Sequence, residues 1–307
     1  MTPVASDNPQ ISPPVTESAP IFIAGWDGFI GRHLTRLAQD SCPHIGLSGC
    51  GATSLNLSAQ DSWKSLSESL SCESRLIILS GVKRQAGDAY SSLETNTQIA
   101  LSLARAIECA KPRRILFFSS AAVYGEETSN TAITESTTVN PVSLYGIAKF
   151  ASERILENAA HAAGSSLLII RPPLIYGPGD TTNSYGPVGF IRSHFKSQPI
   201  TLWGDGSELR EFLYVEDACR LVIELLDTPH EGVLNLVSGQ SHTFRDVISA
   251  LEKVSRKKLN FTVNPRTKTK ADHGFDPSRL RSILPHFQFT ALEDGIQKTF
   301  DYESKQP

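Results

Sequence analysis

From Pro20 onward, short apolar segments alternate with longer stretches of helical periodicity. Apolar runs of four or five residues predict buried strands, and apolar positions that recur every three or four residues predict helices covering them. This alternation is typical of a doubly wound α/β fold built on a parallel sheet. The expected strands are Ile21–Ala24, His44–Leu47, Leu76–Leu79, Arg114–Phe118 and Leu167–Ile170, and the expected helices between them are Ile30–Gln39, Ser91–Cys109 and Leu144–Ala163.

The composition changes before and after this region. Residues 1–19 are rich in Pro, Ser and Thr and contain no Lys or Arg, which predicts a flexible tail rather than a targeting peptide. After Arg171 a stretch rich in Pro and Gly is longer than a simple connection needs. We therefore predict a doubly wound domain over 20–171 and a small C-terminal lobe over 172–307, interleaved with late strands and helices of the first domain. Further helices are expected at Val188–Ser197, Val215–Leu226, Phe244–Ser255 and Leu292–Tyr302.

Overall composition narrows the classes of partner. The 307 residues, 40% of them hydrophobic, can bury a sizeable core. A formal net charge of -3 leaves no basic surplus for a phosphate backbone, so nucleic acid is not an expected partner. No apolar run approaches the roughly 20 residues that span a bilayer, so no membrane association is expected. The five scattered cysteines form no CxxC pair and accompany no histidine cluster, which predicts reduced thiols in a cytoplasmic protein and no metal site.

Three glycines lie between the first predicted strand and the first predicted helix. Gly25, Gly28 and Gly31 have the spacing GxxGxxG. Glycine lets the main chain approach a pyrophosphate closely, and the start of a helix supplies free N–H groups and a partial positive charge. An ordinary glycine-rich turn has the same composition, but the strand before it and the helix after it favour dinucleotide binding by this loop, including Phe29 and Ile30. The doubly wound domain is accordingly expected to be an NAD(P)-binding Rossmann domain.

The end of the second predicted strand bears on the choice of cofactor. An acidic residue about 20 residues after the glycine loop usually holds the ribose 2′-hydroxyl of NAD, but this strand ends in Ser48. Without a carboxylate, a 2′-phosphate is not repelled, and Ser48 with Arg32 or Lys83 could help to bind it. NAD and NADP both stay admissible, and NADP is mildly favoured. Asp27, within the loop, is unfavourable beside a pyrophosphate and is expected to face the solvent.

Three side chains suggest acid–base chemistry near this cofactor. Tyr145 and Lys149 are four residues apart, so both lie on one face of the same predicted helix. An ammonium group and an oxidised nicotinamide would lower the pKa of the phenol and let it exchange a proton. A solvated helix face would give the same spacing, but Ser120 follows the fourth predicted strand, at the carboxyl edge of the sheet where ligands bind. We predict that Ser120 stabilises the substrate oxygen addressed by Tyr145.

Together these segments resemble the extended short-chain dehydrogenases/reductases of the NAD-dependent epimerase/dehydratase type, which act on nucleotide sugars. The resemblance extends over nearly all of residues 21–302. It is carried by GxxGFIG at 25–31, SSAAVYG at 119–125, SLYGIAK at 143–149, RPPLIYGPGD at 171–180 and GDGSELREFLYVEDA at 204–218.

The resemblance implies roles for individual residues. Ser120, Tyr145 and Lys149 would be catalytic, with Tyr145 as the acid/base and Lys149 also binding the nicotinamide ribose. The cofactor would be bound by Gly25, Gly28, Phe29, Ile30, Gly31, Ser48, Lys83, Asn96, Tyr145 and Lys149. The C-terminal lobe would bind the substrate, whose diphosphate would be held by Arg210 and Arg266, although a surface salt bridge is an alternative for Arg266.

One departure from the family pattern limits the reaction. Dehydratases of this family carry an Asp-Glu pair after the catalytic hydroxyl, where this chain has Ala121 and Ala122. Alanine cannot transfer protons, so dehydration is disfavoured. Epimerisation at a sugar ring carbon, C4 above all, and NADPH-dependent reduction of a 4-keto sugar nucleotide both stay open.

Two other classes of protein are alternatives to a nucleotide-sugar enzyme. A catalytically silent NAD(P)-binding sensor or scaffold would usually lose part of the Ser, Tyr and Lys set, and all three are present here. An oxidoreductase of a small alcohol would have no use for Arg210 in its motif. The resemblance also implies a homodimer formed through the helices expected at Ser91–Cys109 and Leu144–Ala163.

Overall fold

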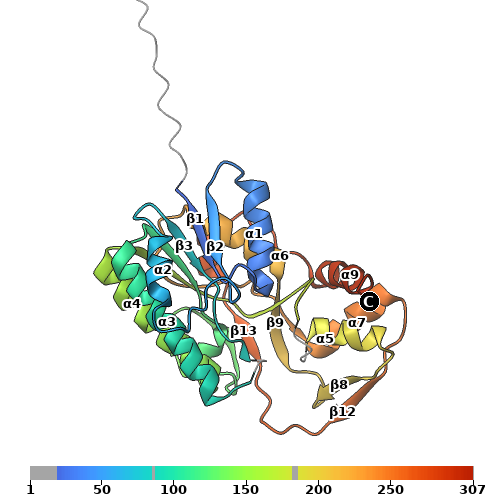
Figure 1. Cartoon of the computed structure of the whole chain (residues 1–307). Helices are drawn as coiled ribbons and strands as arrows, with labels where there is room; N and C mark the ends of the chain where they lie inside the picture. Colours follow the sequence, from blue (N-terminus) through green and yellow to red (C-terminus); the bar gives the residue numbers. More distant parts are fainter. Residues whose placement is uncertain (1–18, 85–86, 182–185, 307) are drawn as a thin grey trace, which may run out of the picture.

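The computed structural model describes residues 19–84, 87–181 and 186–306 (Figure 1). The tail predicted for residues 1–19 therefore lies, except for Ala19, outside the described residues. A six-stranded parallel sheet forms the centre of the molecule, in the order β10-β6-β4-β3-β1-β2. This sheet confirms the doubly wound α/β fold. Its strands are β1 (Ile21–Ala24), β2 (Leu47–Cys50), β3 (Arg75–Ile78), β4 (Arg114–Phe118), β6 (Ser166–Arg171) and β10 (Gly232–Asn235).

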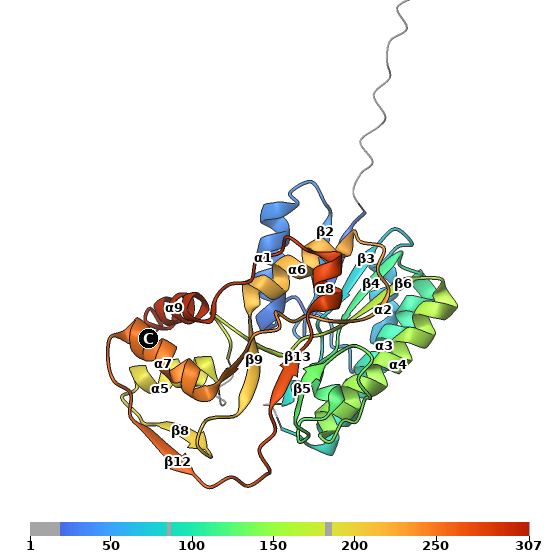
Figure 2. The same ribbon diagram turned by 180° about the vertical axis from the view of Figure 1, so that it is seen from behind.

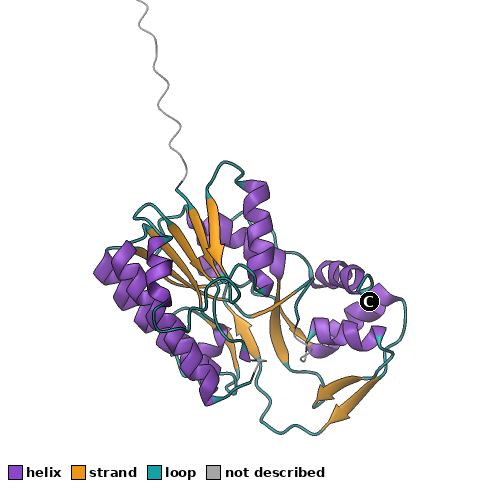
Figure 3. Ribbon diagram, in the orientation of Figure 1, coloured by secondary structure: helices purple, strands orange, loops and turns teal. Residues whose placement is uncertain are grey.

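Helices cover both faces of the sheet, as Figures 1 and 3 show. Successive side chains of a strand point to opposite faces, so each strand contributes to two apolar layers. In β4, Leu116 and Phe118 pack in the layer that contains α1 and α6, whereas Ile115 and Phe117 pack in the opposite layer with α2, α3 and α4. The covering helices are α1 (Phe29–Ser41), α2 (Ser62–Glu68), α3 (Tyr90–Ala110), α4 (Leu144–Ala163) and α6 (Val215–Leu226).

The second strand differs from its prediction. His44 and Ile45 belong to a turn in which the Ile45 N–H donates to the Cys42 carbonyl, and the strand runs instead over Leu47–Cys50. Its register places Ser48 opposite Phe22, within the strand rather than at its end. The prediction placed this strand too early in the chain because Gly49 has low strand propensity and interrupts the apolar run.

A smaller lobe lies beside the sheet, on the right in Figure 1. It contains three helices and a two-stranded parallel sheet: α5 (Pro187–Phe195), α7 (Phe244–Ser255), α9 (Leu292–Glu303), β8 (Ile200–Trp203) and β12 (Phe261–Asn264). Two further small sheets connect the lobe to the main domain: β11 (Ser241–Thr243) with β9 (Leu209–Tyr214) and β7 (Leu174–Tyr176), and β13 (His273–Phe275) with β5 (Asn130–Ile133). The short helix α8 (Ser278–Ile283), labelled in the view from behind in Figure 2, contacts β10. Among the helices described, none is long and apolar enough to cross a membrane.

Candidate active site

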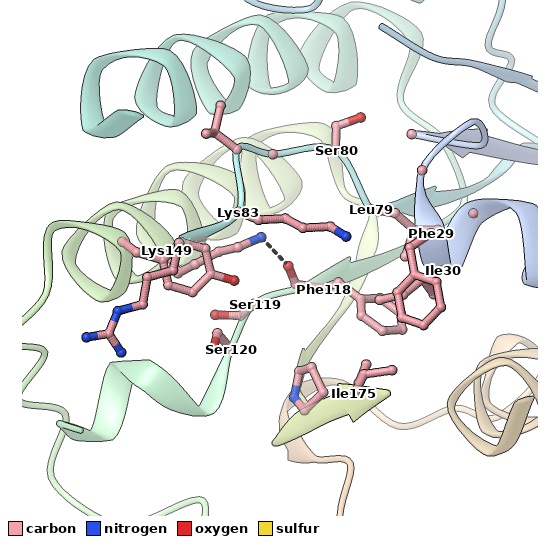
Figure 4. A pocket seen from close by; sticks show the side chains of 18 of the residues that line it. Phe29, Ile30, Leu79, Ser80, Lys83, Phe118, Ser119, Ser120, Lys149 and Ile175 are labelled. Carbon is pink, nitrogen blue, oxygen red and sulfur yellow. Dashed lines mark hydrogen bonds between the residues drawn. The ribbon is translucent and has the colours of Figure 1, made fainter. Parts of the chain in front are cut away.

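A cleft of about 620 Å³ opens at the carboxyl ends of β1, β3 and β4 (Figure 4). Between β1 and β3 the chain runs outward to β2 and then returns to the other side of β1. Such a reversal of strand order leaves a crevice beyond the strand ends, where ligands bind in open α/β sheets. The C-terminal lobe contributes Arg210 and Glu211 from β9, and β13 contributes His273 and Phe275.

The glycine loop forms one wall of this cleft. The five residues predicted to bind the cofactor here, Gly25, Gly28, Phe29, Ile30 and Gly31, all line it. Gly25 has φ +95°, and a Cβ added there would lie 2.8 Å from the main-chain nitrogen of Ser80. A Cβ on Gly31 would lie 2.1 Å from the Gly25 carbonyl oxygen. Both positions therefore require glycine, and the start of α1, which no side chain caps, offers its free N–H groups to an anion.

The predicted tyrosine and lysine are positioned by the start of α4. The Ser143 hydroxyl accepts a hydrogen bond of 3.0 Å from the Gly146 N–H, which caps the helix. Tyr145 is consequently the second residue of the helix, and Lys149 follows one turn later. The Lys149 ammonium group is buried and donates to the Phe118 carbonyl oxygen at 2.7 Å (Figure 4). Tyr145, Lys149 and Ser120 all line the cleft.

The electrostatics of these groups differ in part from the expectation. Burial raises the pKa of Tyr145 above its ordinary value, and the opposing effects come from a hydrogen bond with Ser120 and from the Arg84 charge, rather than from Lys149. Burial lowers the pKa of Lys149 to about 8, against the charge of Glu153. At neutral pH the phenol is therefore protonated and the lysine is mostly charged. Tyr145 is thus ready to donate a proton, and a cationic ligand beside it would favour the reverse transfer.

A buried ion pair between Arg171 and Glu153 stabilises the elements that carry the catalytic residues. The Arg171 guanidinium binds the Glu153 carboxylate through two hydrogen bonds of 2.9 Å and 2.6 Å, and the Ser119 hydroxyl donates to the same carboxylate. Both charged side chains are less than 5% exposed. The Arg171 guanidinium also lies 4.9 Å from the ring centroid of Tyr124. Glu153 is on the helix that carries Lys149, and Ser119 precedes Ser120, so this network fixes the helix relative to the strand end.

Two predicted cofactor residues act in different ways. Lys83 lines the cleft, with its ammonium nitrogen 3.9 Å from the Asp180 carboxylate and 5.2 Å from the Phe29 ring centroid. Asn96 does not line the cleft, although it was predicted to bind the cofactor. Its buried amide accepts from the Val82 N–H at 2.7 Å and donates to the Val82 carbonyl at 3.1 Å. Asn96 therefore holds the loop after β3, which itself lines the cleft.

Three other predictions have different outcomes. Arg210 lines the cleft, and its guanidinium is oriented by Glu208 at 2.7 Å and by the Ala271 carbonyl oxygen. Arg266 does not line the cleft, because ion pairs of 3.0 Å with Asp205 and 3.3 Å with Glu208 hold it elsewhere. Its assignment to the substrate diphosphate therefore stays a prediction, and the observed arrangement is a structural ion pair. Ser48 lies within β2 and does not line the cleft, and its assignment to the cofactor likewise stays a prediction.

Several cleft residues were not predicted from the sequence. An ion pair of 2.7 Å joins Arg84 to Glu126, and both line the cleft near Tyr145. Asp27 also lines the cleft, where it is partly exposed. The position of the Asp27 side chain depends on packing between the glycine loop and β2, so no local sequence pattern predicted it. The sequence signal that could have identified Glu211 as a cleft residue was its position next to Arg210 in the same motif. No group of three or more potential metal ligands occurs within the ranges that the structure describes.

Glu211 makes a pH-dependent contribution to stability. Its carboxylate is 1% exposed, one oxygen accepts from the Ser238 N–H and hydroxyl, and the other has no hydrogen-bond partner among the described residues. Burial raises its pKa to about 7 from the ordinary 4.5. A raised pKa gives stability that is complete below the unfolded-state value and is lost as the pH rises through the folded-state value. The wild type therefore loses stability between about pH 4.5 and 7 through this group.

Glu211→Gln should remove that dependence, because an amide does not titrate. We expect the free energy of unfolding of the wild type, relative to the variant, to fall by about 2 kcal/mol between pH 5 and pH 8. Urea denaturation of both proteins at the two pH values measures the difference. A constant difference between the two proteins would contradict the assigned protonation.

Comparison with known proteins agrees with this geometry. Residues 21–237 match the model of the NAD dependent epimerase/dehydratase family, which is more than half of the chain. The chain therefore belongs to this family. A Bacillus subtilis protein described as an uncharacterized UDP-glucose epimerase is 24% identical and is aligned over 92% of this chain and 98% of its own length.

Solved structures show the same fold. The UDP-N-acetylglucosamine 4-epimerase of Methanobrevibacter ruminantium, in complex with UDP-N-acetylmuramic acid, superposes with a TM-score of 0.82 at 21% identity, covering 95% of this chain and 100% of its own. The UDP-glucose 4-epimerase of Thermus thermophilus, in complex with NAD, has a TM-score of 0.80 at 22% identity and covers 93% of this chain and 99% of its own. The fold class and the resemblance drawn from the sequence are thereby confirmed.

Proposed function

We propose that this protein is an NAD(P)-dependent epimerase of a nucleotide sugar, acting at ring carbon C4. The observation that carries the proposal is the convergence of Ser120, Tyr145 and Lys149 with the glycine loop in one cleft, which Arg210 also lines. The similar proteins are described as epimerases of UDP sugars, and one of them is in complex with NAD. This supports NAD as the cofactor and a UDP sugar as the substrate class.

The cleft residues fit a bound nicotinamide dinucleotide. Gly25 and Gly31 leave no room for side chains, so the main chain of the loop is available to a pyrophosphate. The ammonium group of Lys149 is held in the cleft wall by the Phe118 carbonyl, where it can donate to a ribose hydroxyl. A nicotinamide held by these residues would supply the redox chemistry, as acceptor and then donor of the hydride.

Tyr145 moves the proton that accompanies hydride transfer. As C4 is oxidised, Tyr145 would take the proton of the C4 hydroxyl as the phenolate, the form that the positive charge of an oxidised nicotinamide favours, and the phenol would return the proton to the ketone oxygen when C4 is reduced. The Ser120 hydroxyl, which lowers the pKa of the phenol, would donate to the same substrate oxygen and stabilise the charge that develops there. Arg210 is suited to the substrate diphosphate, because a planar guanidinium binds phosphate oxygens in pairs. The sugar must present its opposite face to the cofactor before the hydride returns.

Two other reactions are weighed against epimerisation. Dehydration needs acid and base groups after the catalytic hydroxyl, and Ala121 and Ala122 supply neither, although both line the cleft. Reduction of a 4-keto sugar nucleotide would use the same three catalytic residues but would consume NADPH. The sequence favoured the reductase because no carboxylate follows the second predicted strand. The carboxylate of Asp27, which lines the cleft, weakens that argument.

A panel of substrates tests the proposal. The purified protein with added NAD is incubated with UDP-glucose, UDP-N-acetylglucosamine and UDP-glucuronate, and the products are separated and identified by NMR. We expect one of them to be converted to its 4-epimer without net change in NADH. Consumption of NADPH with a 4-keto sugar nucleotide, and no epimer from any substrate, would contradict the epimerase assignment and favour the reductase.

We also infer a homodimer formed through α3 and α4, which pack side by side. Leu101 on α3 and Ile147 on α4 each remain 39% exposed, although both are large apolar side chains. Apolar groups on two adjacent helices suit a surface that a second copy covers. Light scattering that gives the mass of a monomer at micromolar concentration would contradict this inference.

A further inference from the structure

The carboxyl end of β2 has almost no side chains. Gly49 and Gly51 flank Cys50, and the main chain of the glycine loop is bonded directly to this end. The N–H groups of Gly25 and Trp26 both donate to the Cys50 carbonyl oxygen, at 2.7 Å and 3.2 Å. The loop and the strand end are thus held against each other at the rim of the cleft.

Side chains from the loop occupy the space that the two glycines leave. A Cβ on Gly49 would lie 2.9 Å from the Trp26 indole, and a Cβ on Gly51 would lie 2.1–2.3 Å from the three carboxyl atoms of Asp27. The Asp27 carboxylate therefore lies where a side chain at position 51 would begin. It is also close enough to Cys50 to raise the pKa of that thiol further, after the larger effect of burial.

The Asp27 carboxylate is available to a ligand. It lines the cleft together with Gly51, Leu55 and Leu57, which follow β2. Across the described ranges, no hydrogen bond or ion pair engages its oxygens. Its main-chain carbonyl is bonded to the Arg32 guanidinium at 2.7 Å, so this arginine is turned toward the loop backbone. An ionised carboxylate with free acceptor sites suits hydroxyl donors and repels phosphate.

We propose that Asp27 replaces the missing strand-end carboxylate: it accepts hydrogen bonds from the adenosine ribose hydroxyls and makes the protein select NAD over NADP. In the usual arrangement the acidic residue is at the end of the second strand. Here the carboxylate comes from the glycine loop, and glycine at position 51 makes room for it. This inference rests on the proposed function, because it requires a dinucleotide in this cleft. It reverses the preference for NADP suggested by the sequence.

The two cations considered for a 2′-phosphate are already engaged by oxygen atoms of the chain. Arg32 is bonded to the carbonyl of Asp27 and, at 3.5 Å, to that of Gly179. Lys83 lies 3.9 Å from the Asp180 carboxylate. A 2′-phosphate beside Gly51 would meet the Asp27 carboxylate, and Arg32 and Lys83 would have to leave their present acceptors to offset that charge. The repulsion is expected to weaken NADPH binding by about 10-fold or more relative to NADH.

Titration of the purified protein with NADH and NADPH, followed by nicotinamide fluorescence, tests the inference without requiring turnover. The wild type should prefer NADH by about 10-fold or more, and Asp27→Asn, which keeps the shape of the side chain, should reduce that preference by about 10-fold. Asp40→Asn, which removes an exposed carboxylate at the other end of α1, is the matched control and should change neither affinity. Thermal unfolding without ligand shows whether each variant is folded.

A double variant tests whether the preference for NADH depends on a carboxylate at this place in the cleft, whichever residue carries it. Asp27→Ser should lose the preference for NADH, and adding Gly51→Asp in the same chain should restore it, since the space vacated by Asp27 is then free for the new side chain. Equal affinity of the wild type for both nucleotides, or an unchanged ratio in Asp27→Asn, would overturn the inference while leaving the proposed function intact. Failure of the folded wild type to bind either nucleotide would overturn both.

Discussion

Replacing Tyr145 with Phe is expected to lower kcat by about 10²–10⁴-fold, the usual contribution of a positioned acid or base. The phenol is the one group in the account that transfers a proton to and from the substrate oxygen. Phe keeps the ring and removes only the hydroxyl, so the cleft should keep its shape. Steady-state kinetics with the substrate identified in the panel measure the effect.

The control for this variant is Tyr90→Phe. Tyr90 is 75% exposed at the start of α3 and does not line the cleft, so its loss of a hydroxyl should leave kcat unchanged. Binding of NADH should be nearly the same in wild type and Tyr145→Phe, because Lys149 and the glycine loop are intact. Turnover by Tyr145→Phe at the wild-type rate would remove Tyr145 from the mechanism.

Glu153→Ala is expected to lower the free energy of unfolding by about 3–5 kcal/mol. The substitution leaves the buried Arg171 guanidinium without its carboxylate and leaves the Ser119 hydroxyl without an acceptor. Removing one partner of a buried ion pair is more costly than replacing both, so Glu153→Leu with Arg171→Met should be less destabilised than Glu153→Ala alone. Chemical denaturation of the three proteins tests this order.

Glu157→Ala is the matched control on the same helix. Glu157 pairs with Arg154 at the surface, and both side chains are about half exposed. Such pairs contribute roughly 0–1 kcal/mol, so this variant should be close to wild type in stability. Equal destabilisation by Glu153→Ala and Glu157→Ala would show that the buried network does not carry the stability assigned to it.

Much of the fold could be predicted because it follows from local periodicity. The helices predicted at Leu144–Ala163, Val215–Leu226 and Phe244–Ser255 agree with the structure at both ends. Their ends carry local signals: Ser143 and Thr243 are side-chain caps, and Gly164 takes the left-handed conformation that ends a helix. The strand at Leu47–Cys50 was misplaced, because glycines interrupt its apolar pattern and its position is set by pairing with β1.

The site was predictable where its chemistry follows from spacing. The four-residue interval between Tyr145 and Lys149 and the glycine loop both indicate geometry directly. For Arg266 and Asp27, the spacing of residues in the sequence does not predict which groups surround the side chain. Arg266 is paired with carboxylates brought near it by tertiary contacts, and the Asp27 carboxylate has room because Gly51, far along the chain, has no side chain. Neither arrangement has a local sequence signal.

The most direct test of the central claim is epimerisation in D₂O. In the proposed reaction a hydride leaves C4 and returns to C4 within one turnover, so it does not exchange with solvent. The predicted result is a 4-epimer that carries no deuterium at C4 by NMR and mass spectrometry. Deuterium at C4 of the product would mean that the carbon was deprotonated rather than oxidised, and it would contradict the account.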